Sequence, residues 1–593
     1  MFQTFSETSN PEQGPPRLAA LRKEMSAQGI DGFIVPRADV HQGEYVAPRD
    51  ERLSWLTGFT GSAGFCVALQ DIAGVFIDGR YRVQVRAQVA DCFTPVHWPE
   101  VSLGSWISEN TPSGSVIGFD PWLHTVAQLR ELETSADDYE LRRTPNLVDA
   151  IWPDQPDPPA APAFVQPVEL TGETHASKID RLAATLGDAQ CAVLTLPDSI
   201  CWLLNIRGDD VPRTPFLHAF ALLHADATVT LFVDEAKLIN LGDHLGSKVR
   251  VAAPSAFQET LKALDGPAQI DPASCPVAVA DALHDGGVDI LETNDPCALP
   301  KACKTQAELE GARAAHLRDG AAMARFLCWL DAQPAGSLTE IDVVKKLEGE
   351  RGATNALRDI SFDTISGSGP NGAIVHYRVT ESTNRTVEPG LLLVDSGGQY
   401  VDGTTDITRT IAIGDVGAEE KRAFTLVLKG MIAISTLRWP SGMAGRDLDA
   451  LARVALWEHG MDYAHGTGHG VGSYLSVHEG PQRLARTGTV AFQPGMILSN
   501  EPGFYKEGAF GIRIENLIVV ENAASLAEHT IPDLLQFETL TWTPIDTRLV
   551  DTSLLTDKER GWLNSYHAQV LEKIGPLVDG AVSDWLSNAC API

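Results

Sequence analysis

Three observations predict a chain of two α/β domains followed by a third domain that mixes helices with antiparallel strands. Alternating strand-like and helical stretches fill residues 1–152 and 173–300, which is typical of sheets covered by helices. A proline-rich segment, 153–167, separates these two stretches. Beyond it, strand-like runs that end in carboxylates alternate with amphipathic helical stretches. We therefore expect domains at 1–152, 173–300 and 301–593.

The first two domains are each marked by short apolar runs of strand length. Gly32–Pro36 and Gly74–Asp78 predict strands of the first domain, and Cys191–Leu196 and Thr228–Val233 predict strands of the second. The segment between the domains, 153–167, contains six prolines. Because proline lacks an N–H group, we expect that segment to be extended and poor at helix or sheet pairing.

The third domain opens with a helix-capping signature and then repeats one motif. Thr305 with a glutamate three residues later predicts a helix start. The run LLLV leads to Asp395 and the run MILSN leads to Glu501, and a second strand-like run follows each, carrying Asp406 and Glu515 respectively. We expect one acid-bearing β-hairpin used twice, with two amphipathic helices between the copies.

These four carboxylates lie beside apolar residues, where an unpaired charge costs several kcal/mol in lost solvation. One interpretation is that the acids form salt bridges, since Arg409 and Arg513 lie near in sequence, or that they face solvent. The other is that two divalent cations balance the four negative charges. An oxygen-rich set with one imidazole suits Mn²⁺, with Zn²⁺ or Co²⁺ as alternatives.

The stretch AHGTGHGVG, residues 464–472, carries two histidines among four glycines. Glycine disfavours a helix, so we expect an extended backbone, on which His465 and His469 lie roughly 13 Å apart. Metal–ligand bonds of about 2 Å cannot join both rings to one metal. One histidine should be a ligand and the other should line the substrate cleft. The glycine side would let another backbone approach closely.

Composition excludes several classes of function. The chain has 46 Lys and Arg against 78 Asp and Glu, a formal charge of −32, which argues against nucleic acid and anionic membrane partners. No secretory signal or membrane span is expected, and nine cysteines without a CxxC pair indicate reduced thiols, so we expect a cytoplasmic protein. The GSGPNG sequence at 367–372 contains Pro370 and predicts no dinucleotide site.

The sequence resembles the cytosolic Xaa-Pro aminopeptidases (aminopeptidase P) of the pita-bread metallopeptidase family. Asp395, Asp406, His469, Glu501 and Glu515 match the dinuclear metal ligands of that family in order and spacing. GAIVHY, HGTGHGVG, VHEGP and NEPGFY resemble its catalytic motifs. RLSWLTGFTGSAG, IDGRY and ICWLLNIRGDDVP resemble its first two domains. The resemblance implies two creatinase-like α/β domains before a pita-bread catalytic domain.

The same resemblance implies a role for each metal ligand. Asp406 and Glu515 would bridge two metal ions, Asp395 would bind one of them, and His469 and Glu501 would bind the other. A hydroxide that bridges the metals would attack the scissile carbonyl. Glu501 would also carry a proton to the leaving prolyl nitrogen.

Further residues match non-ligand positions of the family. His376, His465 and His478 would position the substrate and stabilise the tetrahedral intermediate, while Arg513 and Tyr505 would orient the ligands. The implied activity removes the first residue from peptides with proline at position two. The resemblance also implies a homodimer, in which Trp457 matches an aromatic residue linked to dimerisation.

Two alternatives to this activity are a prolidase-type dipeptidase and a non-catalytic peptide-binding protein of the pita-bread family. The three-domain length argues against prolidase and still more against a methionine aminopeptidase. All five ligand positions are intact, which argues against a protein that only binds peptides.

Overall fold

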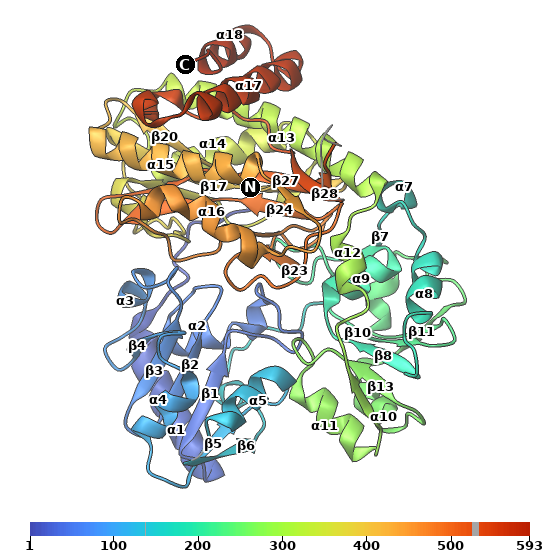
Figure 1. Cartoon of the computed structure of the whole chain (residues 1–593). Helices are drawn as coiled ribbons and strands as arrows, with labels where there is room; N and C mark the ends of the chain where they lie inside the picture. The colour runs from blue at the N-terminus through green and yellow to red at the C-terminus, as the bar shows by residue number, and fades with distance from the viewer. Residues whose placement is uncertain (137, 525–532) are drawn as a thin grey trace. The chain divides into compact units, whose positions relative to one another are not determined.

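The computed structural model describes residues 1–136, 138–524 and 533–593, and these divide into two compact units (Figure 1). The N-terminal unit comprises residues 8–168 and 173–299. The C-terminal unit comprises residues 1–7, 169–172 and 300–593. The first seven residues, which the sequence assigns to the first domain, therefore pack within the C-terminal unit.

The N-terminal unit holds two six-stranded sheets of the same topology. The first has the order β4-β3-β2-β1-β5-β6 and the second β12-β11-β10-β8-β13-β14. In each, one central strand is antiparallel to its neighbour on one side and parallel to its neighbour on the other. The strands are β1 (Gly32–Pro36), β2 (Phe65–Leu69), β3 (Ala73–Ile77), β4 (Thr94–His97), β5 (Ser115–Phe119), β6 (Tyr139–Arg143), β8 (Cys191–Leu194), β10 (Phe220–His224), β11 (Val229–Phe232), β12 (Val249–Ala252), β13 (Ala268–Ile270) and β14 (Ile290–Glu292).

Helices accompany both sheets, as expected for α/β structure. They are α1 (Gly14–Gln28), α2 (Arg52–Thr57), α3 (Gln84–Gln88), α4 (Leu103–Asn110), α5 (Val126–Thr134), α6 (Leu147–Ile151), α8 (His175–Ala183), α9 (Pro197–Leu204), α10 (Phe257–Lys262) and α11 (Val277–Asp285). The short helices α7 (Val168–Thr171) and α12 (Ala298–Ala302) lie where the chain changes units. The four strands predicted for these domains are confirmed to within two residues.

The proline-rich segment differs from the prediction at its end. Residues 155–163 are outside helices and strands, as expected. Phe164–Val165, however, form strand β7, which pairs antiparallel with β9 (Ile206–Arg207). The expectation of no sheet pairing is wrong here, because Phe164 and Val165 follow the last clustered proline and have N–H groups to donate.

The C-terminal unit surrounds its sheets with long helices. Thr305 caps α13 (Gln306–Asp331) through the predicted capping box with Glu308, which is confirmed. The two helices predicted between the hairpins are α15 (Ala418–Ser435) and α16 (Gly445–Trp457), which pack side by side (Figure 1). The remaining long helices are α14 (Glu340–Gly352), α17 (Asp557–Ile574) and α18 (Gly580–Ala589).

Both predicted hairpins are present and have the same plan. β17 (Gly390–Ser396) pairs antiparallel with β20 (Ile407–Ile413), and β24 (Ile497–Asn500) pairs antiparallel with β27 (Asn516–Asn522). A small antiparallel pair connects each: β18 (Gly398–Tyr400) with β19 (Gly403–Thr404), and β25 (Gly503–Lys506) with β26 (Phe510–Arg513). The predicted internal repeat is therefore confirmed.

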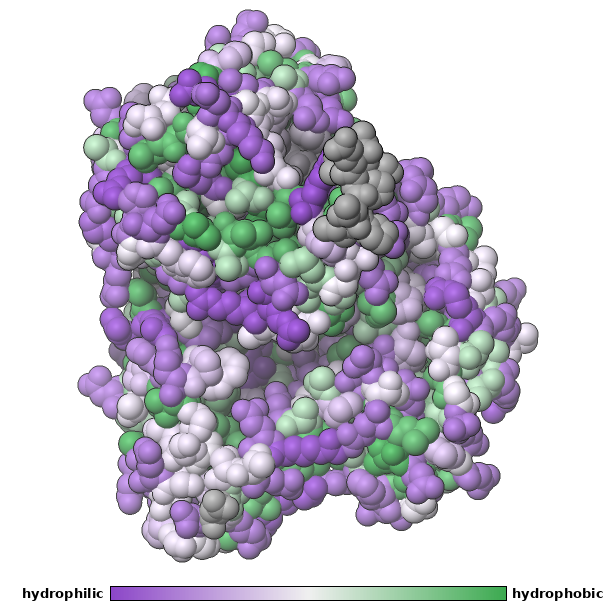
Figure 2. All heavy atoms as spheres, viewed as in Figure 1, coloured by the Kyte–Doolittle hydropathy of each residue, from purple (hydrophilic) through white to green (hydrophobic). Residues whose placement is uncertain are grey.

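The hairpins lie in separate sheets of the C-terminal unit. One sheet has the order β16-β17-β20 and the other β21-β28-β27-β24-β22-β23. The remaining strands are β15 (Leu357–Ile360), β16 (Ile365–Ser368), β21 (Arg438–Pro440), β22 (Gly468–Gly470), β23 (Glu479–Leu484) and β28 (Leu534–Thr539). Hydrophilic residues predominate on the face seen in Figure 2, in keeping with the charged composition. Among the described helices, none combines the length and the apolar character needed to cross a bilayer.

Candidate metal centre

The five predicted ligands all lie at strand positions or strand ends of the C-terminal unit. Asp395 is in β17 and His469 is in β22. Asp406 and Glu515 come directly before β20 and β27, and Glu501 comes directly after β24. The antiparallel register places Asp395 opposite Thr408, two residues beyond Asp406. The antiparallel pairing of the hairpin therefore places Asp395 and Asp406, the two acids of the first motif, at neighbouring positions.

His469 joins the acids through one ring nitrogen. Ligand atoms of Asp406, His469 and Glu515 lie within 4.8 Å of one another. The Nε2 atom of His469 lies 3.5 Å from Asp406 Oδ2 and 3.4 Å from Glu501 Oε1. Its Nδ1 atom is 2.9 Å from the carbonyl oxygen of Gly470, to which it donates. That hydrogen bond holds the ring in the orientation that directs Nε2 toward the carboxylates.

Arginine pairing accounts for only one of the four carboxylates in the described contacts. Arg513 Nη2 lies 2.6 Å from Asp395 Oδ2. Arg409 instead donates to backbone carbonyl oxygens, among them those of Glu515 at 2.6 Å and Thr408 at 2.9 Å. Arg409 therefore holds the backbone that carries Glu515. In the described contacts Asp406, Glu501 and Glu515 have no arginine partner, so pairing with arginine accounts for Asp395 alone.

The pKa values of the acids reflect this excess charge. Burial raises the pKa of Asp395 to about 6, even though Arg513 opposes the shift. Burial, reinforced by repulsion from Asp406, Glu501 and Asp395, raises the pKa of Glu515 well above its usual value. Burial lowers the pKa of His469, but Asp406 and Glu501 outweigh it and raise the pKa to about 9. The protein alone thus leaves the cluster electrostatically unsatisfied.

The residues present fit divalent cations. Within the described structure, the buried atoms Asp395 Oδ1 and Asp406 Oδ1 have no hydrogen-bond partner. Such orphaned carboxylate oxygens are rare unless an ion or water satisfies them. Four carboxylates and one imidazole form a donor set suited to hard or borderline metals. Two divalent cations would balance the four acids.

The glycines on either side of His469 lie where neighbouring backbone leaves no room for a side chain. A Cβ atom at Gly468 would overlap the carbonyl oxygen of Ser499, and one at Gly470 would overlap the carbonyl oxygen of Glu479. The close backbone approach expected on the glycine side is therefore confirmed. The Nε2 atom of His465 lies 2.9 Å from the hydroxyl oxygen of Tyr505. The Nε2 atom of His469 contacts the carboxylates of Asp406 and Glu501.

The other predicted site residues surround the acids. Arg513 Nη1 donates to the Tyr505 hydroxyl at 2.5 Å, so His465, Tyr505, Arg513 and Asp395 form a continuous polar chain. The ring of His478 lies 4.2 Å from that of His469, edge to face. Arg513 Nη2 also contacts the carbonyl oxygen of Val375 at 3.4 Å, which brings the loop that carries His376 to the same arginine.

Two hydroxyl groups that orient the acids were missed by sequence reasoning. Thr408 Oγ1 donates to Glu515 Oε2 at 2.8 Å, and Ser499 Oγ donates to Glu501 Oε1 at 3.1 Å. Thr408 lies two residues after Asp406, and Ser499 lies two residues before Glu501. Since residues two apart share a face of a strand, this spacing was a signal that could have found them.

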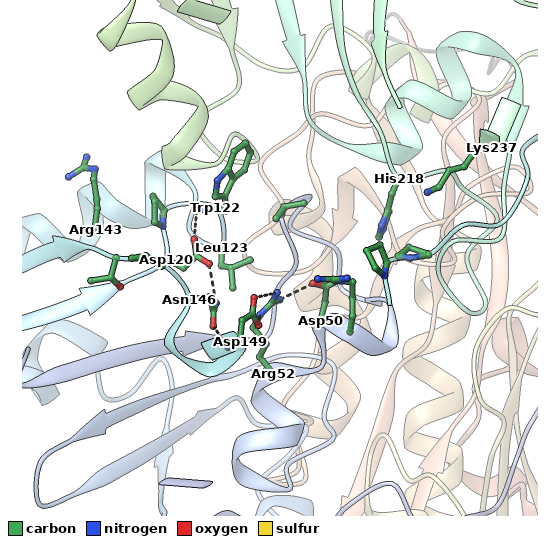
Figure 3. Close-up of a pocket in the computed structure, with 17 residues that line it drawn as sticks. Asp50, Arg52, Asp120, Trp122, Leu123, Arg143, Asn146, Asp149, His218 and Lys237 are labelled. Carbon is green, nitrogen blue, oxygen red and sulfur yellow. Dashed lines mark hydrogen bonds and ion pairs between the residues drawn. The ribbon is translucent and has the colours of Figure 1, made fainter. Parts of the chain in front are cut away.

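A separate pocket lies wholly within the N-terminal unit, and Figure 3 shows the residues that line it. There Arg52 lies between Asp50 and Asp149, at 2.8 and 2.6 Å. Lys237 lies 2.7 Å from Asp210. Each of these three carboxylates has a cationic partner, whereas Asp120, which also lines the pocket, accepts from the Asn146 amide and the Trp122 N–H group.

Four family models match the chain in succession. Two describe a creatinase/prolidase N-terminal domain, at residues 17–151 and 154–308. One describes metallopeptidase family M24, at residues 310–522, and one its C-terminal region, at residues 533–593. The fold class predicted from the sequence is confirmed by these matches.

Curated relatives match over almost the whole chain. Aminopeptidase P1 of Lotus japonicus is 36% identical, with 97% of this chain and 99% of that protein covered. A probable Xaa-Pro aminopeptidase P of Coccidioides posadasii is 39% identical, with 99% and 95% covered. Aminopeptidase P2 of Arabidopsis thaliana is 39% identical, with 97% and 88% covered.

Two solved structures match the chain over different lengths. The X-prolyl aminopeptidase of Caenorhabditis elegans, described as a cytosolic enzyme with a di-nuclear active site, is 33% identical. It superimposes with a TM-score of 0.93, with 98% of this chain and 100% of that chain covered. A Xaa-Pro dipeptidase from Bacillus anthracis, 24% identical with a TM-score of 0.51, covers only 63% of this chain and shows the shared fold alone.

Replacing Gly468 with alanine should disrupt the metal centre. The added methyl group would displace the Ser499 backbone, and with it the hydroxyl that orients Glu501. We expect Gly468→Ala to weaken metal binding about tenfold or more, as loss of a ligand-orienting contact does. Titration of the metal-free variant with Mn²⁺, followed by calorimetry, measures this. Gly349→Ala is the matched control, since Gly349 lies in α14 with open space at its Cβ position; equal Mn²⁺ affinity in both variants would contradict the steric argument.

Proposed function

The chain belongs to metallopeptidase family M24, among the aminopeptidase P proteins, and on that premise we propose that it removes the N-terminal residue from peptides with proline at position two. One observation carries the proposal: ligand atoms of Asp406, His469 and Glu515 come together in the C-terminal unit, and among the described ion pairs the predicted ligands have one arginine partner, Arg513 at Asp395. The near full-length similarity to Xaa-Pro aminopeptidases supports this substrate class.

Asp395, Asp406, His469, Glu501 and Glu515 are proposed to hold two divalent metal ions. When bound, such ions lower the pKa of water and polarise the scissile carbonyl group. Mn²⁺ is the proposed metal, with Zn²⁺ or Co²⁺ as alternatives, because the donors are mainly carboxylate oxygens. Asp406 and Glu515 are the more deeply buried acids, which suits the proposed bridging role.

Glu501 and His469 face the substrate side of the proposed centre. Their side chains are 17% and 22% exposed, whereas that of Asp406 is 4% exposed. Glu501 is proposed to pass a proton to the prolyl nitrogen as the peptide bond breaks. The Ser499 hydroxyl binds its Oε1 atom, which leaves Oε2 to take part in the transfer.

Arg513 and Tyr505 are proposed to orient the ligands, and the remaining histidines to contact the substrate. Arg513 fixes Asp395 and, through the Tyr505 hydroxyl, reaches His465. Half-buried His465 is thereby held at the edge of the cluster. His478, packed against His469, and His376 are proposed to bind the substrate and stabilise the tetrahedral intermediate. The prolyl ring, which lacks an N–H group, suits a pocket defined by shape.

A cytoplasmic location and a homodimer complete the proposal, together with domain limits at 1–152, 173–300 and 301–593. An apolar stripe on α16 supports the dimer. Leu451, Val454 and Trp457 are spaced three residues apart and are 39%, 43% and 42% exposed. Apolar side chains of this size that gather on one helix face are typical of contact surfaces.

The activity is tested with metal-stripped protein reconstituted separately with Mn²⁺, Zn²⁺ and Co²⁺. We expect cleavage of an Xaa-Pro-Xaa tripeptide after its first residue. Asp406→Asn should lose metal and lower the turnover by roughly a thousandfold or more, since a charged ligand to both ions is removed. Cleavage of Xaa-Pro dipeptides only would favour the prolidase-type alternative. Absence of restorable metal would favour a protein that only binds peptides.

Metal removal should destabilise the C-terminal unit. Without cations, four clustered carboxylates repel one another in a buried site. We expect chelation to lower the melting temperature and Mn²⁺ to restore it, because a ligand that binds only the folded state stabilises that state. Differential scanning calorimetry, with metal content measured in parallel, records the shift. An unchanged melting temperature after complete metal loss would argue against the cluster.

The dimer is tested by charging the apolar stripe. Leu451→Glu with Trp457→Glu should convert a dimer into monomers, because two buried negative charges would face their copies across the interface. Analytical ultracentrifugation measures the mass. Glu12→Lys, an exposed change in the N-terminal unit, is the control. A wild-type monomer, or an unaltered dimer in the double variant, would refute the role of the stripe.

A further inference from the structure

The first seven residues, which we call the strap (Met1–Glu7), bind along the C-terminal unit rather than the N-terminal unit that follows them in sequence. The N–H groups of Phe2 and Gln3 donate to the two carboxylate oxygens of Glu348 in α14, at 2.6 and 3.2 Å. The N–H group of Glu381 donates to the carbonyl oxygen of Phe5 at 2.8 Å. These hydrogen bonds attach the strap to the C-terminal unit at Phe2 and Gln3 and again at Phe5.

Gln3 binds a backbone position next to a predicted metal ligand. Its Oε1 atom accepts from the Thr364 N–H at 2.8 Å, and its Nε2 atom donates to the Thr364 carbonyl at 3.2 Å. Gln3 is 3% exposed. The next residue, Ile365, begins β16 and pairs directly with Asp395. The amide of Gln3 therefore fixes the strand that lies against Asp395.

Arg378 ties the strap to the loop that carries His376. Its Nη2 atom donates to the Thr4 carbonyl at 2.7 Å, and its Nη1 atom donates to the Ser6 carbonyl at 3.1 Å. Its Nε atom lies 2.9 Å from Asp363. Because the guanidinium is planar and rigid, these bonds fix the backbone two residues beyond His376.

Phe5 adds apolar contact at the same place. Its ring packs against a cluster of Ile341, Val344, Ile365, Tyr377, Val379 and Leu393, alongside Ile374 and Tyr505. Tyr377 directly follows His376, and Ile365 is the partner of Asp395. Phe5 thus packs against the apolar cluster to which both segments held by the polar bonds contribute.

We propose that the strap is a positioning element of the active site, which holds the His376 loop and the β16 strand in the arrangement that the substrate and Asp395 require. The inference rests on the proposed function. The described contacts of the strap run through Thr364, Arg378 and the apolar cluster that contains Tyr377. A displacement of about 1 Å at such a loop is enough to lower catalysis about a hundredfold.

The test compares the wild-type enzyme with the double variant Gln3→Ala/Phe5→Ala, both loaded with Mn²⁺. We expect kcat/KM on an Xaa-Pro-Xaa peptide to fall about tenfold to a hundredfold, with bound metal unchanged. Phe5→Leu, which keeps apolar contact, should retain most activity. Glu12→Ala, exposed on the N-terminal unit, is the matched control. A double variant within about twofold of the wild type would overturn the inference, as would a loss explained wholly by missing metal.

Hydrogen exchange gives a readout that does not depend on activity. In the double variant, the amides of Thr364 and of residues 375–382 should exchange faster, while those of α17 stay protected. Unchanged exchange in those segments would overturn the inference even for an inactive protein. Failure of the wild-type enzyme to cleave any Xaa-Pro-Xaa peptide refutes the proposed function instead. The two failures are therefore distinguished. Global loss of protection in the double variant would make the strap a requirement for folding and would also overturn the positioning role.

Discussion

Repulsion among four clustered carboxylates is the constraint on which the C-terminal unit depends. Asp395, Asp406 and Glu515 are buried and Glu501 is partly exposed, and among the described ion pairs Arg513 neutralises Asp395. Such a cluster persists only if the surrounding structure holds it and cations compensate it. Two antiparallel hairpins hold the acids in place. The set of donor atoms is suited to cations that would compensate their charge.

The carboxylate cluster is held in place mainly by backbone contacts and by side chains that have no proposed catalytic role. Arg409, fully buried, binds the carbonyl oxygen of Glu515 and so holds the backbone that carries this acid. Gly468 and Gly470 let neighbouring strands approach closely enough for His469 to reach Asp406. The strap extends this support outward, because it binds Thr364 and Arg378 beside the segments that carry Asp395 and His376.

The pocket of the N-terminal unit contains carboxylates that are paired with cationic side chains. The two sheets of this unit have one topology, and the buried Arg52 there is matched by Asp50 and Asp149. A carboxylate paired with a cationic side chain in this way does not need a metal ion to balance its charge. The contrast between the two units explains why chemistry is assigned to the C-terminal unit, although both contain acids, histidines and cavities.

Periodicity and local motifs in the sequence determined much of this protein. The two hairpins, the capping box at Thr305 and the strands near residues 32 and 191 were predictable, because each depends mainly on neighbours close in sequence. Three features depended on tertiary structure. Arg513 pairs with Asp395 whereas Arg409 binds backbone, Phe164–Val165 find a strand partner, and the first seven residues pack on the C-terminal unit. These contacts join residues more than 40 positions apart, and no local pattern encodes which distant group a side chain will meet once the sheets have assembled.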